Sequence, residues 1–161
     1  MSGNIPISGS TIIPSIRYHD AHAAIEWLVR VFGFTKQAVF DGPNNTVAHA
    51  QLTRGKGMLM LGSVTSDTGS DTSYARRWID AKDTGGRETV GLCIIADNND
   101  DCVAIYNRAK AAGVEIVQEL SSPEYGGKSF ACCDPEGHIW WVGSYNPWGQ
   151  HQQATTAEGT A

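Results

Sequence analysis

The sequence predicts an α+β fold built from two similar βαβββ modules. The main observation is an internal repeat: the segment that begins at Asp20 aligns without a gap on the segment that begins at Asp100, and Gly33 meets Gly113 at an offset of 80 residues. In each copy a strand-like apolar run precedes an amphipathic helical segment, and three further strand-like runs follow it. A repeat of this length is a duplicated half-domain. Two similar half-sheets that face each other make a cleft, and clefts are where small molecules bind.

The first module is predicted over residues 11–64. Its helix is expected over 21–32, because Asp20 is a good N-cap and Gly33 is a common helix end. The apolar side chains of this helix form one stripe, at Ile25, Leu28, Val29 and Phe32. Strands are predicted over 11–18, 35–41, 46–53 and 57–63. The helical stripe therefore packs on one face of a sheet and leaves the other face free.

The second module is predicted over residues 89–148 and repeats this order. Its helix is expected over 100–112 and ends at Gly113. The buried stripe of this helix consists of Cys102, Ile105, Tyr106 and Ala109. Strands are predicted over 89–96, 114–120, 128–133 and 138–144. We expect a linker over 65–88 and mobile tails over 1–10 and 149–161, because these segments are polar and have little to bury.

The composition excludes several classes of function. The chain has 161 residues, enough for one domain with a buried core, so it requires no structural metal or disulfide. It carries 12 Lys and Arg against 17 Asp and Glu, a net charge of −5, and contains no basic run. Nucleic acid is therefore not an expected partner.

The sequence predicts a cytoplasmic protein without a membrane partner. No apolar run approaches the roughly 20 residues that span a bilayer, and the first ten residues lack the layout of a signal peptide. The four cysteines form no CxxC pair, and adjacent Cys132 and Cys133 would point to opposite faces of a strand. We interpret them as reduced thiols in or near the core.

Three segments carry a resemblance to a known family: IRYHDAHAAIEWLVRVFGF, VAHAQL followed by GKGMLMLGS, and YGGKSFACCDPEGHIWWVGSYNPW. They resemble the vicinal oxygen chelate superfamily, which comprises glyoxalases, bleomycin resistance proteins and extradiol dioxygenases. The DPEG turn at 134–137 followed by an apolar strand is typical of the last hairpin of that fold, and the pattern is most similar to its PhnB-like branch. The resemblance implies a curved sheet around a central cleft, with the helices outside, and a homodimer.

The resemblance also implies where a metal would bind. Metal-dependent members place one ligand on the first and last strand of each module. In this sequence the corresponding positions are Ile13, Leu61, Val90 and Trp141. Because these side chains offer no N, O or S donor suited to a divalent metal, we expect no metal cofactor. A metal would require a non-standard site, such as His49 with Gln51 and a residue from the other module.

Strand alternation suggests an apolar and aromatic cleft with a few polar points. The expected ligand contacts are Ser15, Arg17, His49, Gln51, Leu61, Leu92, Tyr125, Trp141 and Trp148. In this interpretation Trp141 stacks on a flat ligand and Arg17 meets an anionic group. The alternative is that Trp141 fills the interior and Arg17 pairs with an acidic residue.

The leading functional hypothesis is a metal-independent protein, similar to the bleomycin resistance type, that sequesters an organic ligand such as an antibiotic or an aromatic compound. The competing hypothesis is a lyase, isomerase or dioxygenase that uses a non-standard metal site or has His49 as a general base. A third reading is an interaction module whose cleft is filled by its own side chains. The sequence shows no GxSxG nucleophile turn and no glycine-rich phosphate loop.

Overall fold

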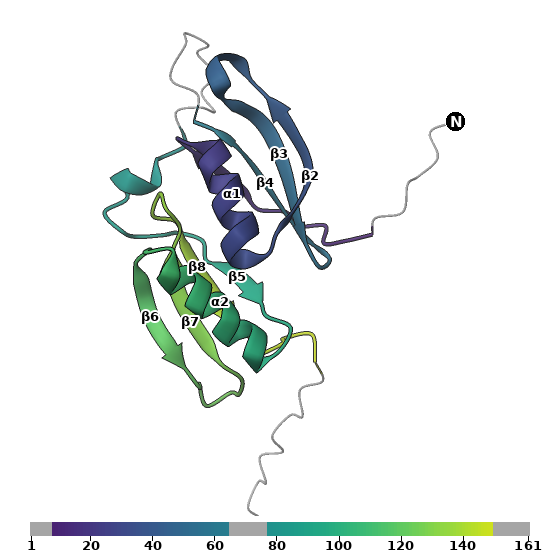
Figure 1. The fold of residues 1–161 in the computed structure, drawn as a ribbon, viewed down its shortest axis with the longest axis vertical. Coiled ribbons are helices and arrows are strands. Elements are labelled where there is room, and N and C mark those ends of the chain that lie inside the picture. Colours follow the sequence, from purple (N-terminus) through teal and green to yellow (C-terminus); the bar gives the residue numbers. More distant parts are fainter. Residues whose placement is uncertain (1–7, 65–76, 150–161) are drawn as a thin grey trace, which may run out of the picture.

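The computed structural model describes residues 8–64 and 77–149, and its elements follow the predicted order (Figure 1). The first module contains β1 (Ser15–Tyr18), α1 (Ala21–Phe32), β2 (Thr35–Asp41), β3 (Val47–Arg54) and β4 (Gly57–Ser63). The second contains β5 (Leu92–Ile95), α2 (Asn99–Ala111), β6 (Ile116–Ser121), β7 (Ser129–Cys133) and β8 (Ile139–Gly143). Short 3₁₀ turns lie at η1 (Pro43–Asn45) and η3 (Ala81–Asp83).

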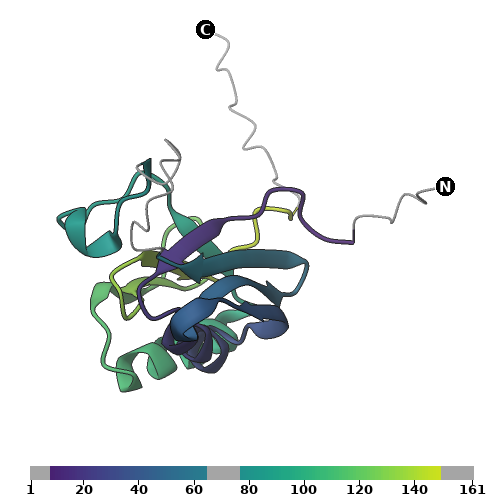
Figure 2. The same cartoon turned by 90° about the horizontal axis from the view of Figure 1, so that it is seen from above.

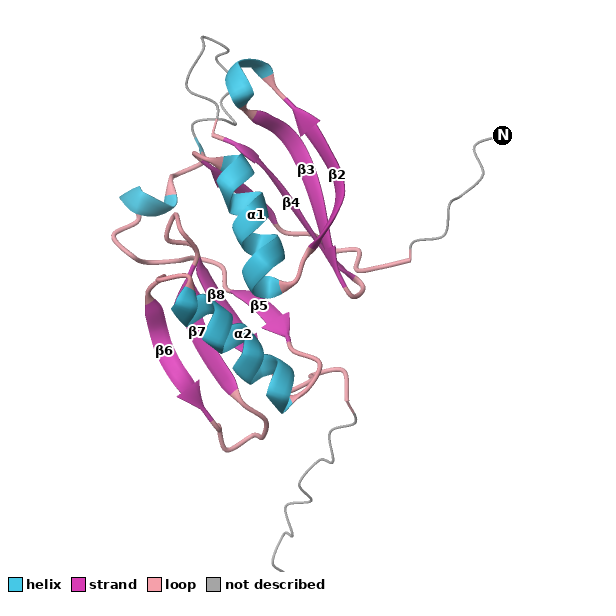
Figure 3. Cartoon of the chain, in the orientation of Figure 1, coloured by secondary structure: helices cyan, strands magenta, loops and turns pink. Residues whose placement is uncertain are grey.

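Each module forms a four-stranded mixed sheet with the same topology. The strand orders are β1-β4-β3-β2 and β5-β8-β7-β6, and the first pair of each sheet is parallel while the other pairs are antiparallel. Both helices lie in front of the strands in Figure 1. Figure 3 shows the same view with the helices in cyan and the strands in magenta. The structure thus confirms the α+β fold of two βαβββ units.

Local sequence signals account for the two helices. The Asp20 carboxylate accepts a hydrogen bond from the backbone N–H of Ala23 at 3.0 Å, and Gly33 ends α1 with a left-handed φ of 75°. Helix α2 begins one residue earlier than expected, because the Asn98 side chain caps it by accepting from the backbone N–H of Asp101 at 2.9 Å. The N-terminal strands β1 and β5 are each shorter than predicted.

One hydrophobic core joins the modules on the helix-bearing side. Phe32 and Phe34, at the end of α1, pack against Trp140 of β8 with ring centroids 5.1 and 6.2 Å apart. The Tyr18 hydroxyl of β1 donates to the Asp134 carboxylate at 2.6 Å. Trp140, Tyr18 and Phe32 are each at most 3% exposed. The modules therefore share buried contacts and not only a covalent linker.

Arg54, at the end of β3, adds directional bonds across the same junction. Its guanidinium donates to the carbonyl of Phe32 at 2.9 Å, to the carbonyl of Ile95 at 2.8 Å and to the Asp101 carboxylate at 3.2 Å. These three bonds hold the two modules together on the helix-bearing side.

Part of the predicted organisation lies outside the described residues. Residues 1–7 and 150–161 of the expected tails, and residues 65–76 of the expected linker, belong to that part. The predicted domain bounds therefore stay a prediction. Within residues 8–64 and 77–149, no helix combines the length and apolar character needed to cross a membrane.

Candidate functional site

The face of each sheet that carries no helix, here called the free face, is the main candidate surface. On β1, Ile16 and Tyr18 are buried against the helix-bearing side, so Ser15 and Arg17 lie on the free face. On β8, Trp140 and Val142 are buried in the same way, and Trp141 alternates with them. Seen from above in Figure 2, the helices lie on one side of the sheets, so both free faces look toward the other side.

Arg17 is the most distinctive side chain on the free face of the first module. It is paired in register with Gly62 of β4, and a Cβ atom added at Gly62 would lie 2.5 Å from an Nη atom of Arg17. The guanidinium therefore lies across β4 where that strand has no side chain. Its Cζ is 5.5 Å from the ring centroid of Trp78, a cation–π contact.

His49 and Gln51 of β3 form the second polar group of the first module. The Gln51 side-chain amide lies 3.2 Å from Nε2 of His49, and the imidazole stacks on Phe40 with ring centroids 6.2 Å apart. Both residues are half-buried. The pair can offer hydrogen bonds to a ligand, and its contacts fix the imidazole orientation.

Two of the expected contacts, Leu61 and Leu92, lie on the wrong face for that role. Leu61 is 1% exposed and is paired in register with Ile16 and Ala50, which are also core residues. Leu92 packs against the core and is paired with Trp140. Their predicted orientation toward the cleft is therefore corrected to the helix-facing side.

The correction has a simple physical cause in the repeat. Ile16 of β1 and Ile94 of β5 are both buried on the helix-facing side of their sheets. Ile16 is paired with Leu61 and Ile94 with Val142, so Leu61 corresponds to Val142. A constant offset of 80 residues matched Leu61 to Trp141 instead, and a slip of one residue moves a side chain to the other face of a strand. The counterpart of Trp141 on the free face is Met60, and Ser15 and Cys93 are the matching residues of the parallel strands.

The free face of the second module carries an indole platform. Trp141 is 42% exposed and is paired with Cys93, which is exposed, and with Ala131, which is fully buried. Tyr125 and Trp148 are 67% and 89% exposed, and the Tyr125 ring contacts that of Tyr145 at 5.4 Å. The predicted alternative in which Trp141 fills the interior is not what the structure shows.

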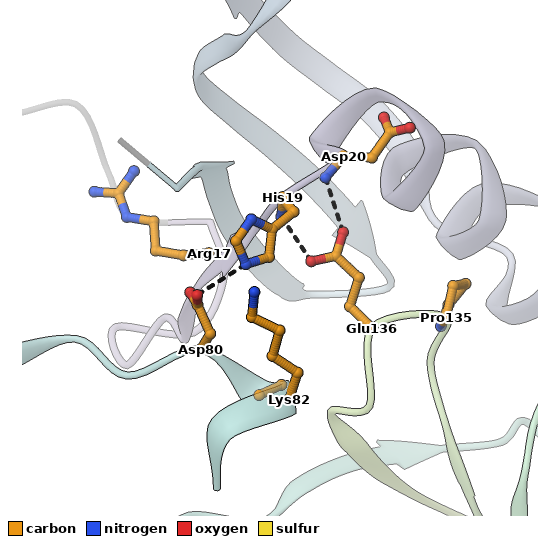
Figure 4. A pocket seen from close by; sticks show the side chains of 8 residues that line it. Arg17, His19, Asp20, Asp80, Lys82, Pro135 and Glu136 are labelled. Carbon is orange, nitrogen blue, oxygen red and sulfur yellow. Dashed lines mark hydrogen bonds and ion pairs between the residues drawn. The ribbon is translucent and has the colours of Figure 1, made fainter. Parts of the chain in front are cut away.

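A pocket of about 290 Å³ lies at the junction of the modules, next to the end of β1 (Figure 4). Its lining residues are Arg17, His19, Asp20, Asp80, Ala81, Lys82, Pro135 and Glu136. The Glu136 carboxylate accepts from the backbone N–H groups of His19 and Asp20 at 2.6 and 2.9 Å. The His19 imidazole is 2.8 Å from the Asp80 carboxylate. Of these lining residues, Arg17 alone was among the predicted ligand contacts.

The side chains present do not fit the metal site of the metal-dependent relatives. The free-face residues at the centre of the paired strands are Ser15 and Met60 in one module and Cys93 and Trp141 in the other, so they supply one thiol, from Cys93, but no imidazole or carboxylate. Across residues 8–64 and 77–149 there is no group of three His, Cys, Asp or Glu side chains that could hold a metal ion. We therefore derive no chemical step through a metal.

The cysteines of β7 do not resemble activated nucleophiles. Burial raises the pKa of the Cys132 thiol to about 12, and burial together with Glu115 raises the pKa of Cys133 to about 11. Burial also raises the pKa of Cys102 on α2. These three thiols therefore stay protonated near neutral pH, and the thiolate is the reactive form.

Comparisons with known proteins agree with this geometry. Residues 12–142 match the family model described as Glyoxalase/Bleomycin resistance protein/Dioxygenase superfamily. No curated protein gave a match. Among solved structures, TioX from Micromonospora sp. ML1 is 25% identical with a TM-score of 0.59, covering 86% of this chain and 100% of its own.

Two further structures share the fold at lower identity. A lactoylglutathione lyase from Agrobacterium tumefaciens is 20% identical with a TM-score of 0.58, covering 88% of this chain and 97% of its own. A glyoxylase/bleomycin resistance protein/dioxygenase domain from Frankia sp. EAN1pec is 15% identical with a TM-score of 0.61, covering 88% and 95% respectively. At these identities the likeness concerns the fold alone.

Proposed function

The chain belongs to the Glyoxalase/Bleomycin resistance protein/Dioxygenase superfamily, and on that premise we propose that it is a small-molecule binding protein that needs no metal. The observation that carries the proposal is that Ser15, Met60, Cys93 and Trp141 occupy the centre of the free faces, where they provide no imidazole or carboxylate to hold a metal. An apolar surface with an exposed indole and few polar groups suits a flat organic ligand. The chain would then sequester such a compound, as an antibiotic-binding protein does.

Trp141 is the proposed stacking platform, with Ser15, Arg17, His49 and Gln51 as polar contacts of the first module. Tyr125 and Trp148 remain predicted contacts near the end of β8. A ligand that stacks on an indole changes its fluorescence, so binding can be followed without a label. We expect saturable quenching by at least one planar aromatic compound in a panel that contains antibiotics and simple aromatics.

The variant Trp141→Ala tests this placement. Truncating a central aromatic contact costs about 2 kcal/mol or more of binding free energy, which corresponds to a loss of about 30-fold in affinity. Val117→Ala on the outer strand β6 is the control, because Val117 is also exposed but lies away from the central strands. Absence of saturable binding across the panel, or equal affinity of the two variants, would contradict the proposal.

We further propose that the chain acts as a homodimer. The two free faces of one chain look toward the same side, and exposed apolar side chains lie near them, with Ile12 at 84%, Val90 at 69% and Trp141 at 42% exposed. A second copy placed over this side would cover the apolar surface and complete the walls of a cleft. Light scattering of the purified chain is expected to give the mass of two copies, and a monomer at micromolar concentration would refute this part.

A further inference from the structure

The charged side chains on the free faces indicate which charge the ligand carries. The paired strands β1 and β4 of the first sheet, and β5 and β8 of the second, place ten residues on these faces. They are Ser15, Arg17, Met58, Met60, Gly62, Cys93, Ile95, Ile139, Trp141 and Gly143. Arg17 is the one member of this set whose side chain is always charged.

Among the described residues, no carboxylate forms an ion pair with Arg17. Across residues 8–64 and 77–149, no Asp or Glu oxygen lies within 4.0 Å of its guanidinium. The nearby carboxylates have other partners: Glu136 accepts from the backbone of His19 and Asp20, and Asp80 contacts the imidazole of His19. Figure 4 shows the guanidinium pointing away from His19, Asp20 and Glu136. The predicted pairing of Arg17 with an acidic residue is therefore not found in the described part of the chain.

Two neighbours of the guanidinium define its place on the free face. Gly62 leaves room for it above β4, and the Trp78 ring contacts it at 5.5 Å. A cation–π contact uses none of the N–H donors of the guanidinium in a conventional hydrogen bond, so these donors remain available to a ligand. Those donors match the two oxygens of a carboxylate, which bind a guanidinium in one plane.

We infer that the ligand is an aromatic monocarboxylate, whose carboxylate binds the edge of Arg17 and whose apolar body lies on the free faces. This inference rests on the proposed binding function and adds the charge of the ligand to it. Arg17 is the one charged side chain among these ten residues, and the nearby Asp80 and Glu136 carboxylates already have partners, so one negative charge on the ligand is favoured beside the guanidinium. A second negative charge would lie near these two carboxylates and is disfavoured. A neutral aromatic compound would leave the positive charge without a partner when it covers the surface.

The test uses a matched acid and amide, 1-naphthoate and 1-naphthamide, titrated into the full chain by calorimetry. They share the two-ring body and differ in charge, so we expect the acid to bind at least about tenfold more tightly, the typical gain from a charge-assisted hydrogen bond. The variant Arg17→Gln should abolish this preference. Arg30→Gln is the matched control, because Arg30 is an exposed arginine on helix α1, away from the free faces.

The outcomes separate this inference from the proposed function. If the acid and the amide bind equally well and Arg17→Gln changes neither, the inference is wrong while the binding function stands. If the acid does not bind but neutral compounds of the panel do, the same conclusion follows. If Arg17 served only to hold Trp78, Arg17→Gln would weaken both probes by the same factor, and that result would also overturn the inference. Circular dichroism of the variant confirms that it is folded.

Discussion

At the scale of single residues, Asp134 has the most partners of any buried polar group described above. It is 3% exposed, and its carboxylate accepts hydrogen bonds from the Tyr18 hydroxyl, the Trp140 indole and the backbone N–H groups of Glu136 and His138. Tyr18 belongs to the first module and the other partners to the second. Asp134 therefore closes the turn before β8 and joins the modules at the same time.

We predict that Asp134→Ala lowers the free energy of unfolding by about 3 kcal/mol, because it leaves the buried Tyr18 hydroxyl and Trp140 indole N–H without an acceptor. Urea denaturation followed by tryptophan fluorescence measures the change. Asp83→Ala, an exposed position in η3, is the control and should change stability by less than about 0.5 kcal/mol. A loss below about 0.5 kcal/mol for Asp134→Ala would show that the carboxylate does not stabilise the fold.

Tyr18 gives a prediction for alkaline pH. Burial, and next the Asp134 charge, raise the pKa of this phenol well above its usual value of about 10. In the unfolded chain Tyr18 ionises near pH 10, whereas the folded chain retains the proton, so the stability that its hydrogen bond contributes is present below pH 10 and falls as the pH rises above it.

We therefore expect the free energy of unfolding to decrease more steeply between pH 9.5 and 11 in the natural chain than in Tyr18→Phe, which has no phenol to ionise. Cys132, with its pKa raised to about 12, contributes to the remaining slope in both proteins. Denaturation at several pH values measures the two slopes. Parallel slopes would contradict the role assigned to the buried phenol.

At the scale of elements, the parallel pair β1 and β4 connects packing to the proposed binding site. Gly62 lies beside Arg17, and the space above it is filled by the Arg17 guanidinium. A methyl group there would meet the movable end of Arg17 at 2.5 Å and the backbone carbonyl of Ala48 at 3.1 Å. The second contact needs a shift of only a few tenths of an ångström, so the strand pairing should survive while the guanidinium is displaced.

We predict that Gly62→Ala weakens 1-naphthoate binding by about tenfold, similar to Arg17→Gln, and changes the free energy of unfolding by less than about 1 kcal/mol. Calorimetry and denaturation provide the two numbers. Gly57→Ala, at the start of the same strand, is a useful control because Gly57 lies away from Arg17. Unchanged naphthoate affinity in Gly62→Ala would mean that the position of Arg17 does not depend on this gap.

The elements themselves were largely predictable from the sequence. The α1 helix begins and ends where Asp20 and Gly33 indicated, because its capping residues and its apolar stripe agree. The strands near Leu61 and Leu92 were predicted, but not the faces on which their side chains lie. In GMLMLGS both faces carry apolar residues, so alternation does not indicate which face is buried. The 80-residue offset of the repeat then matched residues of β4 and β8 with an error of one position, which reverses the face.

The candidate site was predictable only in part for the same reason. Ser15, Arg17, His49 and Gln51 lie on the face that strand alternation indicated, because they alternate with buried residues, and their role as ligand contacts stays a prediction. Met60 and Cys93 were missed because their neighbours are equally apolar. The junction pocket could not be predicted, because it is formed by three segments distant in the sequence, β1, η3 and the turn before β8.

At the scale of the whole molecule, the two modules are expected to behave as one folding unit. They share the packing of Phe32 on Trp140, the Tyr18–Asp134 hydrogen bond and the three bonds of Arg54. Losing these contacts would expose buried apolar surface in both modules. Neither module should therefore stay folded once the other unfolds.

We predict a single unfolding transition that coincides when it is followed by tryptophan fluorescence and by far-UV circular dichroism. Arg54→Ala, which removes bonds to Phe32, Ile95 and Asp101, should lower the free energy of unfolding by about 2 kcal/mol. Two resolved transitions in the natural chain would show that the modules are coupled more weakly than these contacts indicate.

The central claim is that the protein binds an organic ligand without a metal. Its most direct test is the calorimetric titration of 1-naphthoate into full-length chain that has been treated with a chelator and shown by elemental analysis to be free of metal, compared with the same protein supplemented with zinc, iron, nickel or manganese. The account predicts saturable binding of equal affinity in all samples. Binding that requires a divalent metal, or a tightly held stoichiometric metal that survives chelation, would contradict it.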